Sequence, residues 1–366
     1  MNPLLTAGRI GIVKLSSLGD VLLATPVATN LRKASPGAFI AWVTDHRFSE
    51  VLEGNPYVDE VVSLPPVAWP PWKRHARQGD DGESLLQWLT RLRRLRLETV
   101  IDIQGLLKGA LVALASGARW RIGGSRDREG SRYLANVLVP QLPAEAGARD
   151  GYLRYLEHFD IPISDPRLVF ALQQSDRLAG AWILDSLRSG TVIAMAPASG
   201  RHTKDWPLER YAGLADRLAK EVSAQILLIG STKDQAAGAE VQAGMKAKAL
   251  DLTGRTTLRQ LAAVLERCSL LIGGDSGPLY LANAVRTPVL GLFGPTNGCA
   301  LVSTLGKESV LWKPPTCAPC RDWDCRKGEC MLAITVEEVL SRALWLLGGS
   351  TRCGKSAGSS QQAGEE

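Results

Sequence analysis

The stretch LLIGGDSGPLYLANAVRTPVLGLFGPTN, residues 270–297, contains an apolar run, a glycine-rich turn, a short helical segment and a second apolar run, in that order. The two runs, residues 270–272 and 289–293, lack the alternation of a half-exposed strand, which is typical of parallel strands covered on both faces. The stretch therefore predicts a βαβ unit within a parallel sheet that is flanked by helices.

The turn inside this unit has the composition of a phosphate-binding loop. Gly273, Gly274 and Gly277 allow the backbone to approach a ligand closely. Ser276 and the first amides of the following helix can donate hydrogen bonds to an anion. Asp275 repels phosphate, so we expect it to cap the helix or to accept a hydrogen bond from a ligand hydroxyl. An ordinary glycine-rich turn is the alternative that this segment alone leaves open.

Strand and helix patterns alternate along the rest of the chain. In the N-terminal half, strands are predicted at residues 9–15, 39–43, 58–63 and 100–103, and helices at 21–33, 48–52 and 84–97. The second half contains the strands TVIAMAP, QILLIG, KALDL, SLLIGG and VLGLFG, with helices at 208–221, 233–245, 257–268 and 335–347. This alternation predicts an α/β protein with two doubly wound parallel sheets, joined through residues 173–190. Their ligand turns are expected to face each other across a cleft.

The chain has 366 residues and a formal net charge of +6. That charge favours an anionic partner. Three kinds fit equally well by charge: a nucleic acid, a negatively charged membrane surface or a phosphorylated substrate. No nucleic-acid module is recognisable, so we expect no nucleic-acid partner. No apolar run reaches the roughly 18 to 20 residues of a membrane helix, and the first residues lack the pattern of a secretory signal. We therefore expect a cytoplasmic protein.

Three segments resemble a known family: KLSSLGDVLLATPV at 14–27, ASGRHTKDWPLERY at 198–211, and GGDSGPLYLANAVRTPVLGLFGPTN at 273–297. Together they resemble the heptosyltransferases of lipopolysaccharide inner-core synthesis, glycosyltransferase family 9, over nearly the whole chain. The resemblance implies a GT-B fold with two Rossmann-like domains. Residues 1–172 would bind the acceptor and residues 173–347 the nucleotide-sugar donor. Residues 348–366 are small and polar, which is typical of a disordered tail.

The resemblance implies that Asp20 is the catalytic base, and the chemistry agrees. Glycosyl transfer with inversion needs a carboxylate that takes the proton from the acceptor hydroxyl as it attacks the anomeric carbon. A carboxylate in a strand-to-helix turn is held in place for this task. The local sequence alone leaves a second interpretation open, in which Asp20 is a helix cap.

The resemblance also implies a donor site at the ends of the C-terminal strands. It comprises Ser199, Gly200, Lys204, Thr253, Gly254, Asp275, Ser276, Gly277 and Tyr280. Lys204 would contact the donor phosphates and stabilise the charge that builds up on the departing nucleotide, and no metal ion or other cofactor is then required for the chemistry. Without the resemblance, Lys204 reads as a surface lysine before a helix. Thr253 and Gly254 would lie near the nucleotide base.

The chain departs from the family at Tyr280, where members commonly have histidine. A phenol can donate to a phosphate oxygen, but it does not become cationic near neutral pH. The sequence therefore leaves open whether Tyr280 changes the donor preference or the rate from those usual in the family.

Acceptors of the family are phosphorylated, carboxylate-bearing, lipid-linked sugars, so basic residues are expected in the N-terminal loops. The candidates are Lys73, Arg74, Arg77, Arg121 and Arg128. The loop at residues 64–82 combines tryptophans, prolines and bases, a composition able to rest on an anionic membrane interface. We expect it to dock the lipid acceptor, with the protein peripheral on the cytoplasmic face of the inner membrane; a loop without function is the alternative.

Four cysteines follow the pattern C-x2-C-x4-C-x4-C near the C-terminus: Cys317, Cys320, Cys325 and Cys330. Clustered thiols in a reducing compartment indicate structural zinc or an iron–sulfur cluster. The spacing matches no standard zinc repeat, so the sequence favours the alternative of a reduced or disulfide-forming structural loop.

The function that combines these features is transfer of heptose from a nucleotide-heptose, with ADP as the expected nucleotide, to the Kdo/heptose inner core of a lipid A-linked acceptor. Three alternatives stand beside it. One is a family 9 enzyme with another donor or acceptor, and one is a non-catalytic GT-B binding protein. The third is a nicotinamide oxidoreductase or nucleotide-sugar epimerase, which the absence of a G-x-G-x-x-G fingerprint in either first turn disfavours.

Overall fold

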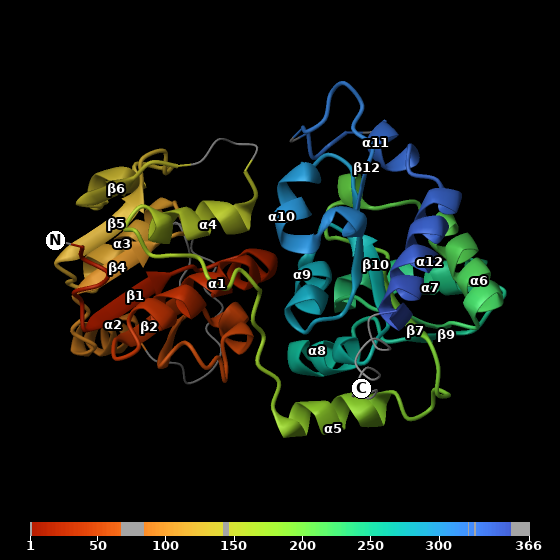
Figure 1. Ribbon diagram of the computed structural model, residues 1–366, viewed down its shortest axis with the longest axis horizontal. Coiled ribbons are helices and arrows are strands. Elements are labelled where there is room, and N and C mark those ends of the chain that lie inside the picture. The colour runs from red at the N-terminus through yellow and green to blue at the C-terminus, as the bar shows by residue number, and fades with distance from the viewer. Residues whose placement is uncertain (1, 67–83, 142–145, 321, 326, 353–366) are drawn as a thin grey trace, which may run out of the picture. The chain divides into compact units, whose positions relative to one another are not determined.

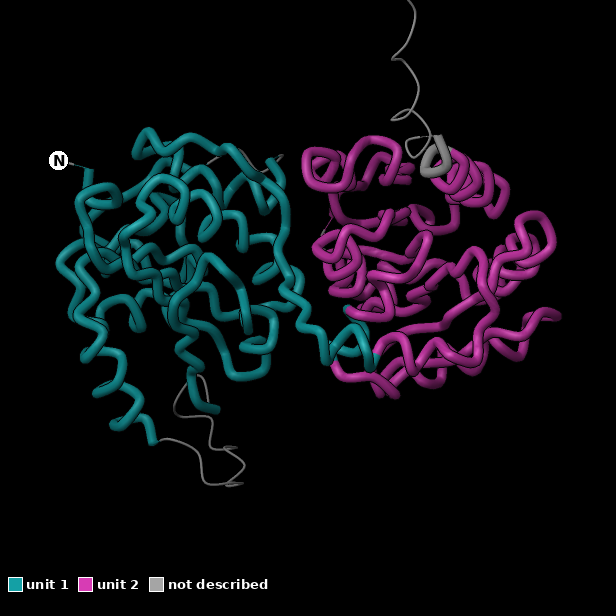
Figure 2. Tube along the Cα trace, turned by 60° about the horizontal axis from the view of Figure 1, so that its bottom comes forward, with its two compact units in different colours: residues 1–179, 258–262 teal, residues 180–257, 263–366 magenta. Residues whose placement is uncertain are grey.

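The computed structural model describes residues 2–66, 84–141, 146–320, 322–325 and 327–352. The chain divides into two compact units, shown in different colours in Figure 2. The first comprises Met1–Ala179 and Leu258–Ala262, and the second Gly180–Thr257 and Ala263–Glu366. Each unit is built on its own parallel sheet (Figure 1).

The sheet of the first unit has six parallel strands in the order β3-β2-β1-β4-β5-β6. The strands are β1 (Arg9–Val13), β2 (Phe39–Asp45), β3 (Glu60–Leu64), β4 (Thr99–Asp102), β5 (Trp120–Gly124) and β6 (Val137–Val139). Its helices are α1 (Leu18–Ala34), α2 (Leu85–Arg94), α3 (Leu107–Ala115) and α4 (Ala148–Glu157), with 3-10 turns η1 (His46–Val51) and η2 (Ser131–Leu134).

Helices cover both faces of this sheet. On one face, Trp88 of α2 and Val112 of α3 pack with Val13 and Val43 of the sheet. Ile12 alternates with Val13 along β1 and is also fully buried, as expected for a strand covered on both sides. Helices α1 and α4 pack against each other, which brings the N-terminal turn of α1 next to residues of α4.

The sheet of the second unit repeats this topology, with six parallel strands in the order β12-β11-β10-β7-β8-β9. The strands are β7 (Val192–Ala196), β8 (Gln225–Leu228), β9 (Ala249–Asp251), β10 (Leu270–Gly274), β11 (Val289–Phe293) and β12 (Val310–Trp312). Its helices are α6 (Leu208–Val222), α7 (Gln235–Gly244), α9 (Gly277–Ala284), α10 (Val302–Leu305), α11 (Glu329–Leu332) and α12 (Val336–Arg352). Two more helices, α5 (Gln174–Ile183) and α8 (Leu258–Glu266), have residues in both units. The 3-10 turns are η3 (His202–Lys204), η4 (Thr232–Asp234), η5 (Cys299–Leu301) and η6 (Lys307–Ser309).

Trp206 anchors the turn between β7 and α6 in the core of the second unit. Its side chain is fully buried, and its indole N–H donates to the carbonyl of Ile334 at 2.9 Å. Its ring also meets the edge of Tyr211, with centroids 5.0 Å apart. Residues 198–205 lie directly before this anchor, so the turn is fixed at one end by core packing.

Two doubly wound parallel sheets were predicted, and the prediction is confirmed. Several of the predicted element bounds were wrong. Helix α1 begins at Leu18, three residues before its expected start at 21, so Asp20 lies within the helix and not in the turn before it. Helix α2 ends at Arg94, three residues before its expected end at 97. The helix expected at 48–52 is the 3-10 turn η1, and α12 continues to Arg352, five residues past its expected end at 347. Residues 353–366, the rest of the expected tail, lie outside the described residues. None of the helices in the described part of the chain is long and apolar enough to cross a membrane.

Candidate active site

Both sheets have the strand order in which the direction of winding reverses beside the first strand. In such sheets ligands bind at the carboxyl ends of the strands next to the reversal. The reversal lies between β1 and β4 in the first unit and between β7 and β10 in the second. Asp20 follows β1, whereas Lys204 follows β7 and Asp275 follows β10.

Asp20 lies in the first turn of α1, and both of its carboxylate oxygens have partners. Oδ2 accepts hydrogen bonds from the backbone N–H and the hydroxyl of Ser17, at 3.1 and 2.9 Å. Oδ1 accepts a hydrogen bond from the hydroxyl of Tyr152 on α4, at 2.9 Å. The N-cap residue of α1 is Ser17, so the interpretation of Asp20 as the N-cap was wrong; Asp20 is the N3 residue and completes a capping box with Ser17. Asp20 is half-buried, and Oδ1 keeps one lone pair for a ligand.

The loop that precedes Asp20 is held by a neighbouring loop of the same sheet. The side-chain oxygen of Gln104, which follows β4, accepts from the backbone N–H groups of Leu15 and Ser16 at 2.9 and 3.2 Å. The backbone N–H of Gln104 in turn donates to Asp102 at 2.9 Å. The turns after β1 and β4 therefore form one hydrogen-bonded unit.

Lys14, at the end of β1, is buried close to Asp20. Its ammonium lies 4.7 Å from the centre of the Tyr152 ring. Burial lowers the pKa of Lys14, and the charges of Asp20 and Asp102 oppose that shift. The carboxylates and the ring thus compensate a cation that would be costly to bury alone.

In the second unit, Lys204 and Asp275 join the turns after β7 and β10. The ammonium of Lys204 and Oδ2 of Asp275 are 2.7 Å apart, and both side chains are largely buried. The hydroxyl of Tyr280, on α9, donates to the other oxygen of Asp275 at 2.6 Å. Tyr280, expected to donate to a phosphate oxygen, is therefore hydrogen-bonded to the partner of Lys204.

Asp275 is not the cap of α9. The N-cap residue is Ser276, and its hydroxyl makes a 3.4 Å hydrogen bond to the carbonyl of Gly274 without capping the helix. Pro278 has no N–H, and the N–H of Leu279 donates to the carbonyl of Ser276. The amides of Ser276 and Gly277 lie at this end of the helix, where the helix dipole favours an anion.

Ser199 and Gly200 form the first part of the turn after β7. The backbone N–H and hydroxyl of Ser199 donate to one oxygen of Asp205, at 2.7 and 2.6 Å. Gly200 has a φ of 76°, a conformation that favours glycine. A Cβ atom on Gly274 would lie 3.0 Å from the carbonyl oxygen of Lys204, so the two turns are in close contact.

Thr253 and Gly254 follow β9. The Thr253 hydroxyl donates to Asp251 at 2.5 Å and the side chain is buried, so its role is in the fold of the turn. Gly254 has a φ of 68°, and its N–H donates to the carbonyl of Gly230 after β8.

Comparison with known proteins identifies the chain. The model of glycosyltransferase family 9 (heptosyltransferase) matches residues 86–331. The chain belongs to glycosyltransferase family 9. It is 30% identical to lipopolysaccharide heptosyltransferase 1 of Pseudomonas aeruginosa over 87% of each chain, and 25% identical to the lipopolysaccharide core heptosyltransferase OpsX of Haemophilus influenzae over 77% of this chain and 78% of the relative.

Solved structures of family 9 share the fold. The family 9 glycosyltransferase of Veillonella parvula superposes with a TM-score of 0.77 at 24% identity, covering 93% of this chain and 97% of that one. ADP-heptose heptosyltransferase II of Escherichia coli gives a TM-score of 0.73 at 22% identity, with 94% and 99% covered. This family 9 chain is therefore a glycosyltransferase with the two Rossmann-like domains of the GT-B fold.

The cysteine-rich segment of this family 9 enzyme lies against the turn that carries Lys204. All four cysteines line one pocket together with Thr203. Among the described residues, however, no three Cys, His, Asp or Glu side chains are arranged so that they could hold a metal ion. The side chains thus do not fit the zinc or iron–sulfur site expected at Cys317, Cys320, Cys325 and Cys330, and the cysteines are unpaired thiols.

Trp323, within the same segment, was not among the predicted site residues. Its ring lies 4.7 Å from the guanidinium carbon of Arg201 and 5.5 Å from the ammonium of Lys204. Both contacts have cation–π geometry. The sequence gives no sign of this contact, because Trp323 is more than a hundred residues from either cation.

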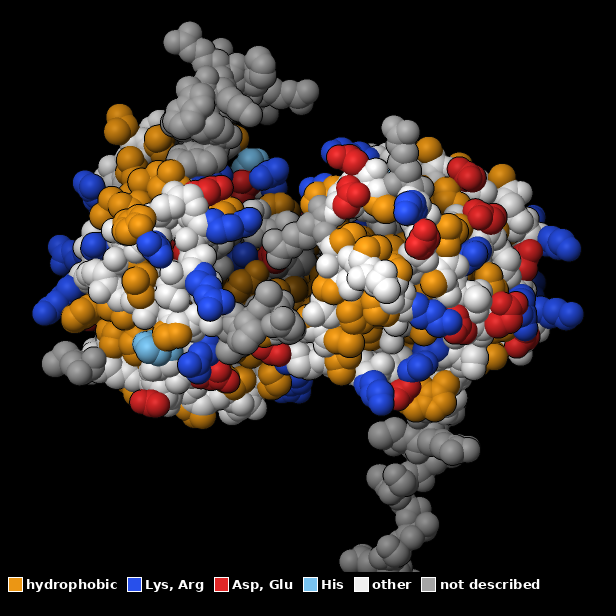
Figure 3. Space-filling view, turned by 90° about the horizontal axis from the view of Figure 1, so that it is seen from above, with side chains coloured by type: hydrophobic (Ala, Val, Ile, Leu, Met, Phe, Trp, Pro, Cys, Tyr) orange, Lys and Arg blue, Asp and Glu red, His pale blue; other side chains and the backbone are white. Residues whose placement is uncertain are grey.

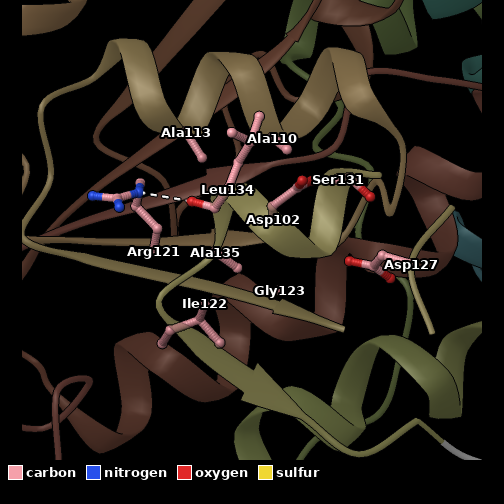
Figure 4. A pocket seen from close by; sticks show the side chains of 10 residues that line it. All are labelled: Asp102, Ala110, Ala113, Arg121, Ile122, Gly123, Asp127, Ser131, Leu134 and Ala135. Atoms are coloured by element: carbon pink, nitrogen blue, oxygen red, sulfur yellow. Dashed lines mark hydrogen bonds between the residues drawn. The ribbon is translucent and has the colours of Figure 1, made fainter. Parts of the chain in front are cut away.

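The basic residues expected to bind the acceptor occupy different places. Lys73, Arg74 and Arg77 lie outside the described residues. Arg121 lies within β5, and its guanidinium donates to the carbonyls of Leu134 and Ala118 at 2.9 and 3.2 Å, which indicates a role in the fold (Figure 4). Arg128 is exposed at the carboxyl end of β5, the same edge of the sheet that carries Asp20.

The described lysines and arginines are not gathered into one stripe on the face seen in Figure 3. On that face of the second unit they are interspersed with aspartates and glutamates. This distribution differs from the continuous basic surface that tracks a nucleic-acid backbone.

A small pocket of the first unit contains two carboxylates, Asp102 and Asp127 (Figure 4). Burial raises the pKa of Asp102 to about 7, and the neighbouring charge of Asp127 adds to the shift. Burial also raises the pKa of Asp127, which accepts hydrogen bonds from Gly124 and Gln141. Asp102 also accepts the hydrogen bond from the backbone N–H of Gln104, so this pocket adjoins the loop that holds the turn before Asp20.

The raised pKa of Asp102 predicts a pH-dependent effect on stability. Between its unfolded pKa near 4 and its folded pKa of about 7, the folded state holds a proton that the unfolded state releases, so stability falls as pH rises through this range. Asp102→Asn removes this titration. From pH 4.5 to pH 8, we expect the unfolding free energy of the variant to gain about 2 to 4 kcal/mol relative to wild type.

Urea unfolding of both proteins at these two pH values measures the effect. Asp160→Asn, which changes an exposed aspartate of the same unit, is the matched control and should keep a constant offset from wild type. An equally constant offset for Asp102→Asn would show that Asp102 titrates at its ordinary pH.

Proposed function

We propose that this glycosyltransferase moves a heptose from a nucleotide-heptose, with ADP as the nucleotide, to the Kdo/heptose inner core of a lipid A-linked acceptor. The relatives described above are named as lipopolysaccharide heptosyltransferases, and a solved structure of the E. coli heptosyltransferase WaaC contains ADP. The observation that supports the reaction most directly is a half-buried carboxylate, Asp20, fixed at the ligand edge of the first sheet.

In this proposal Asp20 is the general base of an inverting transfer. Its carboxylate takes the proton of the acceptor hydroxyl while that oxygen attacks the anomeric carbon and the bond to the donor diphosphate breaks. The reaction passes through no covalent sugar–enzyme intermediate.

The departing diphosphate gains negative charge, and the groups at the ends of β7 and β10 are suited to stabilise it. Lys204 supplies a cation, while the Ser276 hydroxyl and the amides of Ser276 and Gly277 supply hydrogen bonds. Lys204 must leave or share its ion pair with Asp275 to contact a phosphate. We propose that Asp275 aims Lys204 and that Tyr280 holds Asp275, and that no cofactor takes part in the chemistry.

Arg128 is the described candidate for binding the anionic groups of the acceptor, since it is exposed on the same sheet edge as Asp20. Lys73, Arg74 and Arg77 remain candidates by composition. We propose that the loop containing them contacts the anionic inner-membrane surface from the cytoplasm. Deletion of residues 66–77 should then abolish binding to vesicles that contain anionic lipid.

Transfer of heptose from ADP-heptose to Kdo-bearing lipid A tests the proposed function. We expect product to form without added metal and in the presence of a chelator. A matched reaction with heptosylated acceptor distinguishes addition of the first heptose from addition of the second. If neither acceptor gives product while the enzyme still binds ADP, the proposed substrates are contradicted.

A further inference from the structure

We propose that Tyr152 is a positioning residue for Asp20: its hydroxyl holds the base in the orientation that accepts the proton. This inference rests on the proposed role of Asp20 and deepens it. Tyr152 does not touch the reacting atoms, and it acts through the carboxylate. Nothing in the local sequence around Asp20 indicates the contact, because 132 residues separate the two positions.

The two oxygens of the Asp20 carboxylate accept hydrogen bonds from two different elements. Ser17, in the same helical turn, donates twice to Oδ2, whereas Tyr152 donates once to Oδ1 from α4. Bonds to Oδ2 alone would leave the carboxylate able to rotate about its last torsion, whose energy well is broad. The bond from Tyr152 fixes that rotation and directs the remaining lone pair of Oδ1.

Tyr152 is itself held in place by its surroundings. Its helix packs against α1, and Lys14 of β1 lies 4.7 Å from the centre of its ring. Tyr152 is thus held by a helix and by a buried cation that the sheet positions. A side chain fixed in this way can hold a carboxylate to the tolerance that proton transfer requires.

The phenol of Tyr152 stays protonated beside Asp20. Burial raises the pKa of Tyr152 well above its ordinary value, and the charge of Asp20 adds to the shift, so the phenol keeps the proton that it donates. The other titratable groups close by are Lys14, Asp102 and Tyr155. Tyr152 is therefore a donor to Asp20 over the working pH range.

Tyr152→Phe tests the inference, because it removes the hydroxyl and keeps the ring beside Lys14. A hydrogen bond to a charged group is worth enough that its loss is expected to lower kcat about 10- to 100-fold. Affinity for ADP-heptose should not change. The acidic limb of the pH–kcat profile should move to higher pH, because the ionised base loses a donor.

Tyr155→Phe is the matched control. Tyr155 lies on the same helix and is also buried, but its hydroxyl is close to Asp127 and Gln141 rather than Asp20. We expect this variant to keep kcat within about threefold of wild type. The same loss in both variants, with an unshifted pH profile, would overturn the positioning role and indicate a general effect on α4.

A double variant separates this inference from the proposed function. In an Asp20→Asn background, where no base remains to be positioned, Tyr152→Phe should add no further loss to residual turnover. If Asp20→Asn alone is fully active, the assignment of the base fails. If Asp20→Asn is impaired but Tyr152→Phe retains wild-type kcat and pH profile, the base stands and the positioning role is overturned.

Discussion

Replacement of Asp20 by asparagine is expected to lower kcat for heptose transfer by about a hundred- to ten-thousandfold, the range that a general base contributes. Asparagine has nearly the same shape and keeps one oxygen that can accept from Ser17 or Tyr152, but it cannot take a proton. The loss should therefore appear in kcat, with little change in the affinity for the donor. Steady-state kinetics and calorimetric titration with ADP-heptose measure the two quantities separately.

Asp160→Asn is the control for the Asp20 experiment, because it makes the same chemical change at an exposed position of the same unit. It should retain the activity of wild type. Asp20→Ala should be as inactive as Asp20→Asn, though less stable, since alanine also removes the bonds to the first turn of α1. An active Asp20→Asn enzyme would show that another group takes the proton, or that Asp20 only stabilises the helix.

The strands that could be predicted from the sequence are those whose apolar runs are continuous. Residues 270–272 and 289–293 were predicted because parallel strands covered on both faces carry this pattern. Strands β5, β6 and β12 were not predicted: β5 contains an arginine and ends in two glycines, and β6 and β12 have only three residues each. All three become strands because their neighbours in the sheet offer hydrogen bonds, which a local pattern does not encode.

The residues of the candidate site also differ in whether the sequence could indicate them. Asp275 could be proposed from its local glycine-rich motif, whereas the roles of Asp20, Ser199 and Lys204 were implied by the family that their segments resemble. Their partners could not, since they come from distant parts of the chain.

The pairing of Lys204 with Asp275 spans 71 residues. This pairing changes the interpretation of Asp275 from a helix cap to the anion that holds Lys204. A carboxylate two residues before the first helical residue is compatible with both roles from the sequence, and the position of the cation distinguishes them.

Replacement of Lys204 by methionine is expected to lower kcat/KM about a hundred- to a thousandfold, comparable to the loss of a group that stabilises transition-state charge. Methionine keeps the length and apolar stem of lysine but removes the cation. The reason is electrostatic: charge on the diphosphate grows as the glycosidic bond breaks, so a cation stabilises the transition state more than the bound donor. Most of the loss should therefore lie in kcat, and Lys204→Arg should recover part of it.

Asp275→Asn distinguishes two roles of Lys204: stabilising charge on the diphosphate, and holding together the turns after β7 and β10. This variant removes the ion pair but keeps the cation and an acceptor for Tyr280. If Lys204 acts on the diphosphate, Asp275→Asn should lose less activity than Lys204→Met, because the freed ammonium can still reach a phosphate. Equal losses of activity and of melting temperature in the two variants would instead mean that the pair only holds together the turns after β7 and β10. A donor analogue without negative charge discriminates further, since Lys204→Met should bind it as well as wild type does.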